Sequence, residues 1–285
     1  MFKGIDVSVH NGDINWGDVK NSDIKAVIIK ATEGVNFVDK MLENHYKGAN
    51  SVGMNIGFYH FMSEKTSPAQ QARDFWTAIK DKKFNILPCL DIETNKLGRT
   101  RTQISDRCIE FLNEFKRLSG YDCMIYTGGF FGRDNLDSRV KKYPGWIAHY
   151  GVKEPMQTGF TVVGHQYTED GRTPGVKTRV DLNNFDDGIF IKHNKPVEKP
   201  SKPSYKLIPQ NGTCTVLVDE LMIREEPSTS SKSVGSYNKG ESVIYDYYVD
   251  NEGYRWISWI ASKSKKRRYM AVRVLSNNKR YGHCV

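Results

Sequence analysis

The first 128 residues alternate short apolar runs with amphipathic segments, and this alternation constrains the fold more than any other feature of the chain. Residues 37–52, 67–81 and 102–120 carry apolar side chains at three- and four-residue steps, the period of an amphipathic helix. We expect Thr102 to cap the last of these and Gly120 to end it. The intervening runs are rich in β-branched and aromatic residues, as in buried strands; they occupy residues 2–8, 25–34, 54–61, 84–93 and 122–128.

The helical pattern fades after residue 130. Three further strand-like runs follow at residues 145–150, 160–168 and 179–185, with only loop-like sequence between them. Five strand–helix units followed by three strands predict an α/β fold, a barrel of parallel strands whose late helices are missing or reduced.

Polar and aromatic residues gather where these strands end. In a barrel of this kind, the carboxyl ends of the strands build the active site. Asp91 and Glu93 are separated by one residue, so both project from the same face of an extended strand. Acids and aromatic rings are the groups that a carbohydrate cleft uses. The strand-end residues are Asp6, Ser8, His10, Lys30, Glu33, Tyr59, Phe61, Asp91, Glu93, Tyr126, His149, Tyr150, Gln166, Tyr167, Asp181 and Asn183.

The composition changes abruptly at residues 192–210, where prolines and lysines replace the apolar periodicity. Such a segment is typical of a solvated linker. Beyond it, short strand-like runs with turns between them and no helical pattern predict a small all-β barrel. We therefore divide the chain into a first domain at 1–192, a linker at 193–206 and a second domain at 207–285.

The second part carries most of the positive charge of the chain. The whole sequence has a net charge of +9, and residues 193–285 hold 16 Lys and Arg against 9 Asp and Glu, a surplus of +7. A basic module suits an anionic partner such as nucleic acid, a membrane surface or an acidic wall polymer. Its aromatic residues exceed the needs of so small a core, which predicts that some of them line a binding groove.

Cysteine usage and the amino terminus bear on the cellular compartment. The five cysteines are spread widely without a C-x-x-C pair, so we expect buried, reduced thiols and neither a zinc site nor a disulfide scaffold. The first residues lack a basic segment followed by an apolar one, which predicts synthesis in the cytoplasm without a signal peptide. No phosphate loop or cofactor fingerprint is present, so we expect neither a metal nor a cofactor.

Six short motifs occur in the order found in glycoside hydrolase family 25: "GIDVSVHNGDINW", "IKATEG", "GFYHF", "LDIE", "WIAHY" and "VDLNNF". Residues 2–191 therefore resemble these N-acetylmuramidases, the Chalaropsis-type lysozymes. Separately, "IREEPSTSS" and "GYRWISWIASKSKKRRYMAVR" resemble the bacterial SH3-type wall-binding domain. A catalytic module, a linker and a wall-binding module in this order are similar to a bacteriophage endolysin that attacks the peptidoglycan of a Gram-positive host. An endolysin of this kind would leave the host cytoplasm through a holin pore.

The family resemblance implies a flattened (β/α)5β3 barrel, followed by a small SH3-like barrel. It implies hydrolysis of the β-1,4 bond between N-acetylmuramic acid and N-acetylglucosamine, with Glu93 as general acid and Asp91, Asp6 and Asp181 as the other acids of the site. Glu93 would need a raised pKa, whereas Asp91, held by hydrogen bonds, would stay ionised. Asp91 could orient the substrate's N-acetyl group or stabilise an oxocarbenium-like transition state.

Further residues are candidates for contact with the saccharide or the wall. The aromatic ones could stack on sugars, form the walls of the cleft or belong to the core, and Lys30 with Glu33 could contact the saccharide or form a structural ion pair. Many family members have Trp-Gln-Tyr where this chain has His165, which favours a packing role there. The substrate candidates are Lys30, Glu33, Tyr59, Phe61, Tyr126, Trp146, Tyr150, Gln166 and Asn183, and the wall-binding candidates are Tyr247, Tyr254, Trp256, Trp259 and Arg268.

Two other functions are open to a chain of this composition. A catalytically dead wall-binding protein would be expected to lack one of the four acids, yet all four are present. The basic run at 262–268, with aromatic residues nearby, is also compatible with a nucleic-acid module. Because Lys and Arg runs are usually solvated faces, we expect peptidoglycan as the partner, with neither nucleic acid binding nor membrane insertion. The sequence does not predict an oligomeric state.

Overall fold

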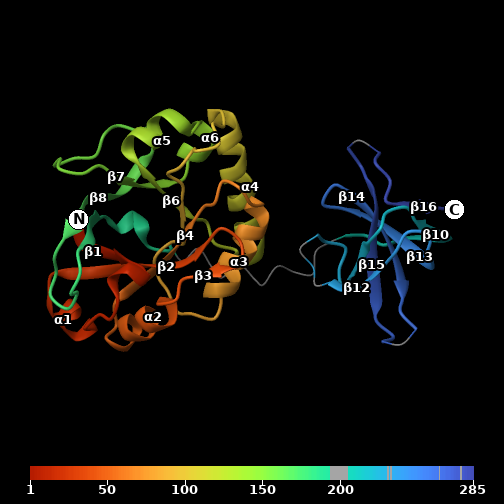
Figure 1. The fold of residues 1–285 in the computed structure, drawn as a ribbon, viewed down its shortest axis with the longest axis horizontal. Coiled ribbons are helices and arrows are strands. Elements are labelled where there is room, and N and C mark those ends of the chain that lie inside the picture. Colours follow the sequence, from red (N-terminus) through yellow and green to blue (C-terminus); the bar gives the residue numbers. More distant parts are fainter. Residues whose placement is uncertain (193–204, 230, 232, 263, 277) are drawn as a thin grey trace. The chain divides into compact units, whose positions relative to one another are not determined.

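The computed structural model describes residues 1–192 and 205–285, except residues 230, 232, 263 and 277. The chain forms two compact units, Met1–Pro200 and Ser201–Val285 (Figure 1). The predicted linker at 193–206 lies almost wholly outside the described residues. Among the helices that are described, none combines the length and apolar character needed to cross a membrane.

Eight strands of the first unit close into a barrel. The sheet runs in the order β1-β9-β8-β7-β6-β5-β4-β2-β3, and β1 also pairs with β2, which joins the two sides. The mixed α/β barrel predicted from the sequence is therefore confirmed. The strands are β1 (Phe2–Val7), β2 (Ile24–Glu33), β3 (Phe37–Val38), β4 (Asn55–Phe61), β5 (Cys89–Asp91), β6 (Met124–Gly128), β7 (Pro144–Ala148), β8 (Thr161–Gly171) and β9 (Val180–Phe185).

The prediction that all barrel strands are parallel was wrong for β9. This strand runs antiparallel to both β8 and β1, whereas the other neighbours around the barrel pair in parallel. A parallel connection needs a long crossover, usually a helix, and the segment between β8 and β9 contains none. The antiparallel pairing places Asp181 of β9 directly opposite Asp6 of β1.

Helices cover the outside of the barrel, and α3 and α4 lie side by side there (Figure 1). The predicted helices are present, but α2 begins only at Leu42, since Phe37 and Val38 form β3. Thr100 rather than Thr102 caps α4, with its side chain accepting from the Gln103 amide. Gly120 ends that helix in the left-handed conformation, as expected. Two short helices also follow residue 128, where the sequence pattern indicated none. The helices are α1 (Trp16–Asn21), α2 (Leu42–Ser51), α3 (Pro68–Ile79), α4 (Arg101–Ser119), α5 (Gly129–Asn135) and α6 (Ser138–Lys141).

Alternation along the strands determines which side chains enter the barrel. In and after β5, Leu90 and Ile92 pack outward in the core beneath the helices, while Cys89 packs inside with Trp146 and Phe185. The period of two therefore turns Asp91 inward as well. One end of the barrel interior is filled by apolar residues, and the other end receives the acids.

The second unit is all-β in its described part, as predicted. Seven strands form one sheet in the order β12-β11-β15-β14-β13-β10-β16. Two small clusters of apolar side chains make its core, one around Tyr245 and Met270 and one around Val249 and Trp256. The strands are β10 (Ile208–Val216), β11 (Leu221–Arg224), β12 (Ser233–Tyr237), β13 (Ser242–Asn251), β14 (Tyr254–Ile260), β15 (Arg267–Val274) and β16 (Gly282–Cys284).

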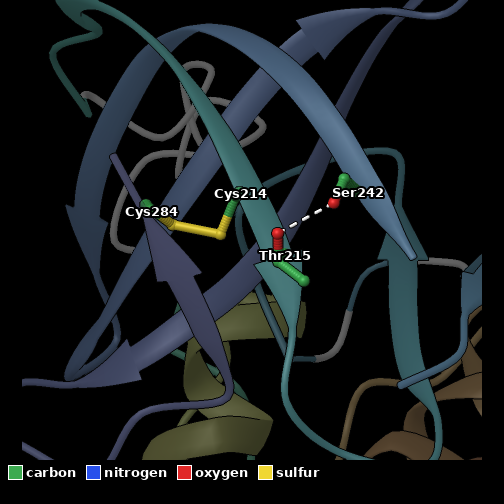
Figure 2. Close-up of a disulfide and its surroundings, with 4 residues drawn as sticks. All are labelled: Cys214, Thr215, Ser242 and Cys284. Atoms are coloured by element: carbon green, nitrogen blue, oxygen red, sulfur yellow. Dashed lines mark hydrogen bonds between the residues drawn. A yellow bond between two sulfur atoms is a disulfide. The ribbon is translucent and has the colours of Figure 1, made fainter. Parts of the chain in front are cut away.

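A disulfide joins Cys214 of β10 to Cys284 of β16 (Figure 2), so the expectation that all five thiols are reduced was wrong. The two cysteines are opposite each other, 4.0 Å apart at Cα, beside the backbone pair formed by Thr213 and Val285. Non-hydrogen-bonded pairs in antiparallel strands bring their side chains closest together. Their separation of 70 residues left no signature in the sequence. The other three cysteines are free and buried.

Candidate active site

An open pocket of about 290 Å³ lies at the carboxyl ends of the barrel strands. All four predicted acids line it, together with most of the predicted substrate-contact residues. Glu33 and Asn183 do not line it but hold residues that do. The pocket residues are Asp6, Ser8, His10, Lys30, Tyr59, Phe61, Asp91, Glu93, Tyr126, Trp146, Tyr150, Gln166, Glu169 and Asp181.

Among the four acids, Asp6 is the one held by hydrogen bonds from neighbouring amide side chains. It is buried at the end of β1, and its Oδ2 accepts hydrogen bonds from Gln166 Nε2 at 2.9 Å and from Asn183 Nδ2 at 2.8 Å. Gln166 is fixed in turn because its Oε1 accepts from the hydroxyls of Tyr126 and Tyr150, both at 2.7 Å. The amide groups of Gln166 and Asn183 therefore favour a charged Asp6 carboxylate.

Asp181 shares a proton with Asp6. Burial raises the pKa of Asp6 to about 6, although hydrogen bonds from Asn183, Gln166 and Asp181 oppose the rise. Burial and the negative charge of Asp6 raise the pKa of Asp181 to about 8. Near neutral pH a protonated Asp181 thus donates to an ionised Asp6, and the pair carries one negative charge rather than two.

Asp91 differs from what the sequence suggested. It is buried, and neither of its carboxylate oxygens accepts a hydrogen bond from a described residue; Oδ1 is wholly removed from solvent. Burial raises the pKa of Asp91 well above its usual value, and the charge of Glu93 adds to the rise. The expectation that hydrogen bonds keep Asp91 ionised was therefore wrong, since burial without donors disfavours the charged form.

Glu93 follows β5, and its side chain is exposed at the mouth of the pocket. The part that packs into the pocket is nevertheless desolvated, which raises the pKa of Glu93, and the charge of Asp6 adds to the rise. A raised pKa and access to the pocket are the two properties that a proton donor near neutral pH needs. Glu93 combines them, whereas Asp91 is enclosed.

Lys30 places a positive charge beside the acids of the pocket. Its Nζ lies 2.8 Å from Glu33 Oε2 and 5.2 Å from the centre of the Phe61 ring. The ion pair and the ring hold the lysine at the end of β2, where its charge opposes the pKa rise of both Asp91 and Glu93. Glu33 thus acts on the pocket through Lys30.

The aromatic candidates divide into exposed and buried residues. Tyr150 is 42% exposed and can present its ring to a ligand, and Tyr59 and Phe61 are half-buried. Trp146 is only 1% exposed, and its indole nitrogen donates to Asn183 Oδ1 at 2.7 Å. A sugar cannot stack on a face that is covered, so Trp146 forms part of the pocket wall and is not a stacking platform. Trp146 supports the Asn183–Asp6 contact instead.

Burial also corrects the predicted wall-binding residues of the second unit. Trp256 and Trp259 are 1% and 8% exposed and belong to its core. Tyr254 is half-buried against Trp256, and Tyr247 lies under the guanidinium of Arg267 at 4.8 Å. Arg268 donates to the backbone of Arg267 and to Ser264. Composition alone does not distinguish a surface aromatic from a core aromatic, which explains the error.

Glu169 is a pocket residue that the sequence reasoning missed. It is exposed near the end of β8, and its charge contributes to the raised pKa of both Asp181 and Glu93. The signal that could have identified it is its position two residues beyond Tyr167, in a strand already assigned to the site.

Replacing Asp181 with asparagine is expected to stabilise the folded protein, and more so at high pH. The pKa of Asp181 is higher in the folded state than in the unfolded chain, so the unfolded chain gives up this proton first and the stability of the wild type falls as the pH rises from about 4 to about 8. The asparagine side chain would keep the hydrogen bond to Asp6 without titrating. One pKa unit corresponds to about 1.4 kcal/mol, and since the side chain is partly exposed we expect a gain of roughly 1–2 kcal/mol at pH 8.

Thermal unfolding at pH 4.5 and pH 8 measures this effect. The exposed Asp187→Asn variant is the matched control, because it removes the same charge from the strand's neighbouring turn. A stability gap between Asp181→Asn and wild type that does not grow with pH would contradict the shared proton.

Comparison with known proteins identifies the family. Residues 5–176 match the model for glycosyl hydrolases family 25, and residues 206–272 match the bacterial SH3 domain model. The chain is 35% identical over 190 residues to the autolytic lysozyme of Clostridium acetobutylicum, an alignment that covers 67% of this chain and 57% of that protein. The chain therefore spans little more than half the length of that relative.

Solved structures agree with this match. A bacterial lysozyme from Streptomyces coelicolor aligns with a TM-score of 0.57 and 31% identity, over 65% of this chain and 92% of that one. The CTP1L endolysin aligns with a TM-score of 0.58 and 29% identity, over 66% and 68% of the two chains. Since the family match spans more than half of the sequence and includes Asp6, Asp91 and Glu93, the protein belongs to glycosyl hydrolases family 25.

Proposed function

We propose that the protein is an N-acetylmuramidase, a lysozyme that hydrolyses the β-1,4 bond between N-acetylmuramic acid and N-acetylglucosamine in peptidoglycan. The observation that carries this proposal is the grouping of Asp6, Asp91, Glu93 and Asp181 in one pocket at the carboxyl ends of the barrel strands. Two carboxyl groups of different environment are what glycoside hydrolysis requires, one to give a proton and one to face positive charge. Family membership and the lysozyme relatives support the same reaction.

In the proposed mechanism, Glu93 protonates the glycosidic oxygen as the bond to the leaving sugar breaks. Positive charge then develops at the anomeric carbon of the retained sugar. Asp91, buried and without hydrogen-bond donors, faces this charge. The mechanism uses the ionised form of Asp91, which the charge of Lys30 favours. Because no donor compensates this carboxylate, its attraction to a developing cation is stronger than it would be in solvent.

The same property lets Asp91 act through the substrate. The 2-acetamido N–H would provide the donor that Asp91 lacks, and the acetamido oxygen could then attack the anomeric carbon, as in substrate-assisted hydrolysis. The anomer of the first product, measured by proton NMR, separates retention from inversion. The paired Asp6 and Asp181 carry a single charge in the same pocket, where they position the substrate or water.

Muropeptide analysis tests the proposed bond specificity. Purified peptidoglycan is digested with the protein, and the new reducing ends are identified by mass spectrometry after borohydride reduction. A muramidase yields reduced muramic acid. Reduced glucosamine at the new ends would overturn the bond assignment, and shortened stem peptides without new reducing ends would overturn the glycosidase assignment.

We further propose that the protein is a phage endolysin that acts on the wall of a Gram-positive host after release through a holin pore. Its likeness to the CTP1L endolysin and the match to a bacterial SH3 domain support this role. Lysis of Gram-positive cells when the protein is added from outside, together with lysis from within only when a holin is co-expressed, is the expected result.

Deletion of residues 205–285 is expected to weaken binding to purified cell walls by roughly ten-fold or more and to narrow the range of salt concentration in which the enzyme is active. The second unit supplies most of the positive charge, and an attached wall-binding unit raises the local concentration of the barrel at its substrate. Co-sedimentation with walls at increasing sodium chloride measures the effect. Equal sedimentation of residues 1–204 and of the full chain would contradict a targeting role.

A further inference from the structure

The second unit contains a pocket that none of the predicted wall-binding residues lines. Its volume is about 140 Å³, and it is surrounded by residues of β10, β13, β14, β15 and β16 and by Arg280, which precedes β16. We call it the arginine pocket and define it by Gln210, Tyr245, Tyr248, Arg255, Arg273 and Arg280. Ile257 and Val272, both buried, form its apolar floor.

The arginine pocket has an excess of positive charge. None of its lining residues is acidic. Asp250 binds Arg255 through both carboxylate oxygens, at 2.8 and 2.7 Å, and so neutralises one guanidinium. Arg273 and Arg280 face each other across a β-bridge, and within the described part of the chain neither side chain forms an ion pair or hydrogen bond. Like charges on directly opposed residues are destabilising, unless an anion lies between them.

Tyr245 contributes a hydroxyl donor to the arginine pocket. The residue is only 3% exposed, and its hydroxyl makes no hydrogen bond to any described residue although it lines the pocket. The hydroxyl oxygen itself reaches the solvent in the pocket, where it can donate a hydrogen bond to a ligand oxygen. The ring of Tyr248 lies 4.2 Å from the guanidinium of Arg255, which holds that group in a fixed orientation.

We propose that the arginine pocket binds the terminal carboxylate of a short peptide, which the proposed function identifies as a stem peptide of peptidoglycan. Arg273 and Arg280 lack a close ion-pair partner among the described residues, although the charge of Asp250 also acts on Arg273. Their guanidinium groups and a hydroxyl donor match a carboxylate. The apolar floor of Ile257 and Val272 suits the small side chain of a terminal alanine. The volume corresponds to about four or five water molecules, enough for the end of a peptide. A phosphodiester polymer would leave the apolar floor unmatched.

Fluorescence anisotropy with a synthetic peptide tests the proposal on the full chain. The probe is fluorescein-labelled L-alanyl-D-isoglutaminyl-L-lysyl-D-alanine with a free terminal carboxylate, compared with the same peptide as a terminal amide. Neither probe contains a glycosidic bond, so the measurement is independent of the proposed hydrolysis. We expect the amide to bind roughly ten-fold more weakly or worse, because it loses a charge-assisted pair of hydrogen bonds.

Substitutions of the pocket residues test whether the peptide binds in the arginine pocket. The double variant Arg273→Gln, Arg280→Gln is expected to weaken binding of the free acid by roughly ten-fold or more, and Tyr245→Phe by a few-fold. The matched control is Lys239→Gln, Lys266→Gln, which removes two exposed cationic charges of the same unit outside the pocket. The control should bind as wild type does, and unchanged melting temperatures show that all variants are folded.

Three results would overturn the proposal. Equal binding of acid and amide would exclude carboxylate recognition. An equal loss in the lysine control would mean that net charge, and not the pocket, attracts the peptide. Binding of poly(glycerol phosphate) that the Arg273, Arg280 variant abolishes, without binding of the peptide acid, would assign the pocket to a phosphate polymer instead. Hydrolysis of peptidoglycan by the same variants, scored separately, reports on the proposed muramidase alone.

Discussion

Replacing Glu93 with glutamine is expected to lower the rate of peptidoglycan hydrolysis by roughly 10³-fold or more while the fold is retained. General acid catalysis contributes about 10²–10⁴-fold to a rate, and the sugar departs poorly unless its oxygen receives a proton. The glutamine amide has almost the same shape as the glutamic acid side chain but cannot donate a proton to the glycosidic oxygen. The side chain is exposed at the mouth of the pocket, so the substitution breaks no core packing. Clearing of a peptidoglycan suspension, with circular dichroism to verify folding, measures the result.

The matched control for this variant is Glu154→Gln. Glu154 is exposed in the loop between β7 and β8 and does not line the pocket, so its loss changes the net charge without touching the site. We expect the control to clear peptidoglycan at the wild-type rate. Lysis by Glu93→Gln at that same rate would refute the assignment of Glu93 as proton donor.

The pH profile gives a second measurement of the same assignment. Because the pKa of Glu93 is raised, the proton donor stays protonated to a higher pH than an ordinary glutamate would. Wild-type activity should therefore fall on the alkaline side as Glu93 loses its proton. The residual activity of Glu93→Gln, carried by the other acids, should lack that alkaline limb.

The barrel and the acid site could be predicted because they depend on local periodicity. The alternation of Leu90, Asp91 and Ile92 is legible in the sequence, and it places a carboxylate inside the barrel at a strand end. The order of strands and helices then brings together Asp6 and Asp91, which are far apart in the chain. Both steps use only the two-residue period of strands, the 3.6-residue period of helices and the rule that barrel active sites lie at the carboxyl ends of the strands.

Features that depend on long-range pairing or on desolvation could not be predicted. The bond between Cys214 and Cys284 follows from the register of two strands separated by 70 residues. The raised pKa of Asp91 follows from the absence of donors among the described residues around it, which no sequence pattern records. Trp256 was misassigned for a related reason, since an aromatic residue in a small sheet has the same local sequence whether it faces the core or a ligand.

The Asp6–Asp181 pair and Asp91 represent two ways of placing acids in one site. Asp6 is surrounded by amide donors and shares a proton with Asp181, so its charge is already compensated before a substrate arrives. Asp91 has no such compensation from the described residues. A group that is poorly solvated in the free enzyme gains most from a charge that appears only in the transition state, and such differential stabilisation accelerates the reaction.

This difference predicts the outcome of Asp91→Asn. We expect kcat to fall by roughly 10²–10³-fold and KM to change much less, because the main interaction that is lost is the one with charge that develops during the reaction. The folded protein should at the same time become more stable above neutral pH. The pKa of Asp91 is raised in the folded state, so its ionisation costs stability as the pH rises, and asparagine removes that cost.

Steady-state kinetics on soluble peptidoglycan oligosaccharides and thermal unfolding at pH 8 measure both effects in one preparation, with the exposed Asp81→Asn as the matched control. A loss of activity together with a loss of stability would indicate that Asp91 serves the fold. Retained activity would show that Glu93 works without a second carboxylate at this position. A gain in stability with a fall in kcat is the combination that a structural role cannot produce, because only a residue kept for catalysis remains buried and unpaired at a cost to the fold.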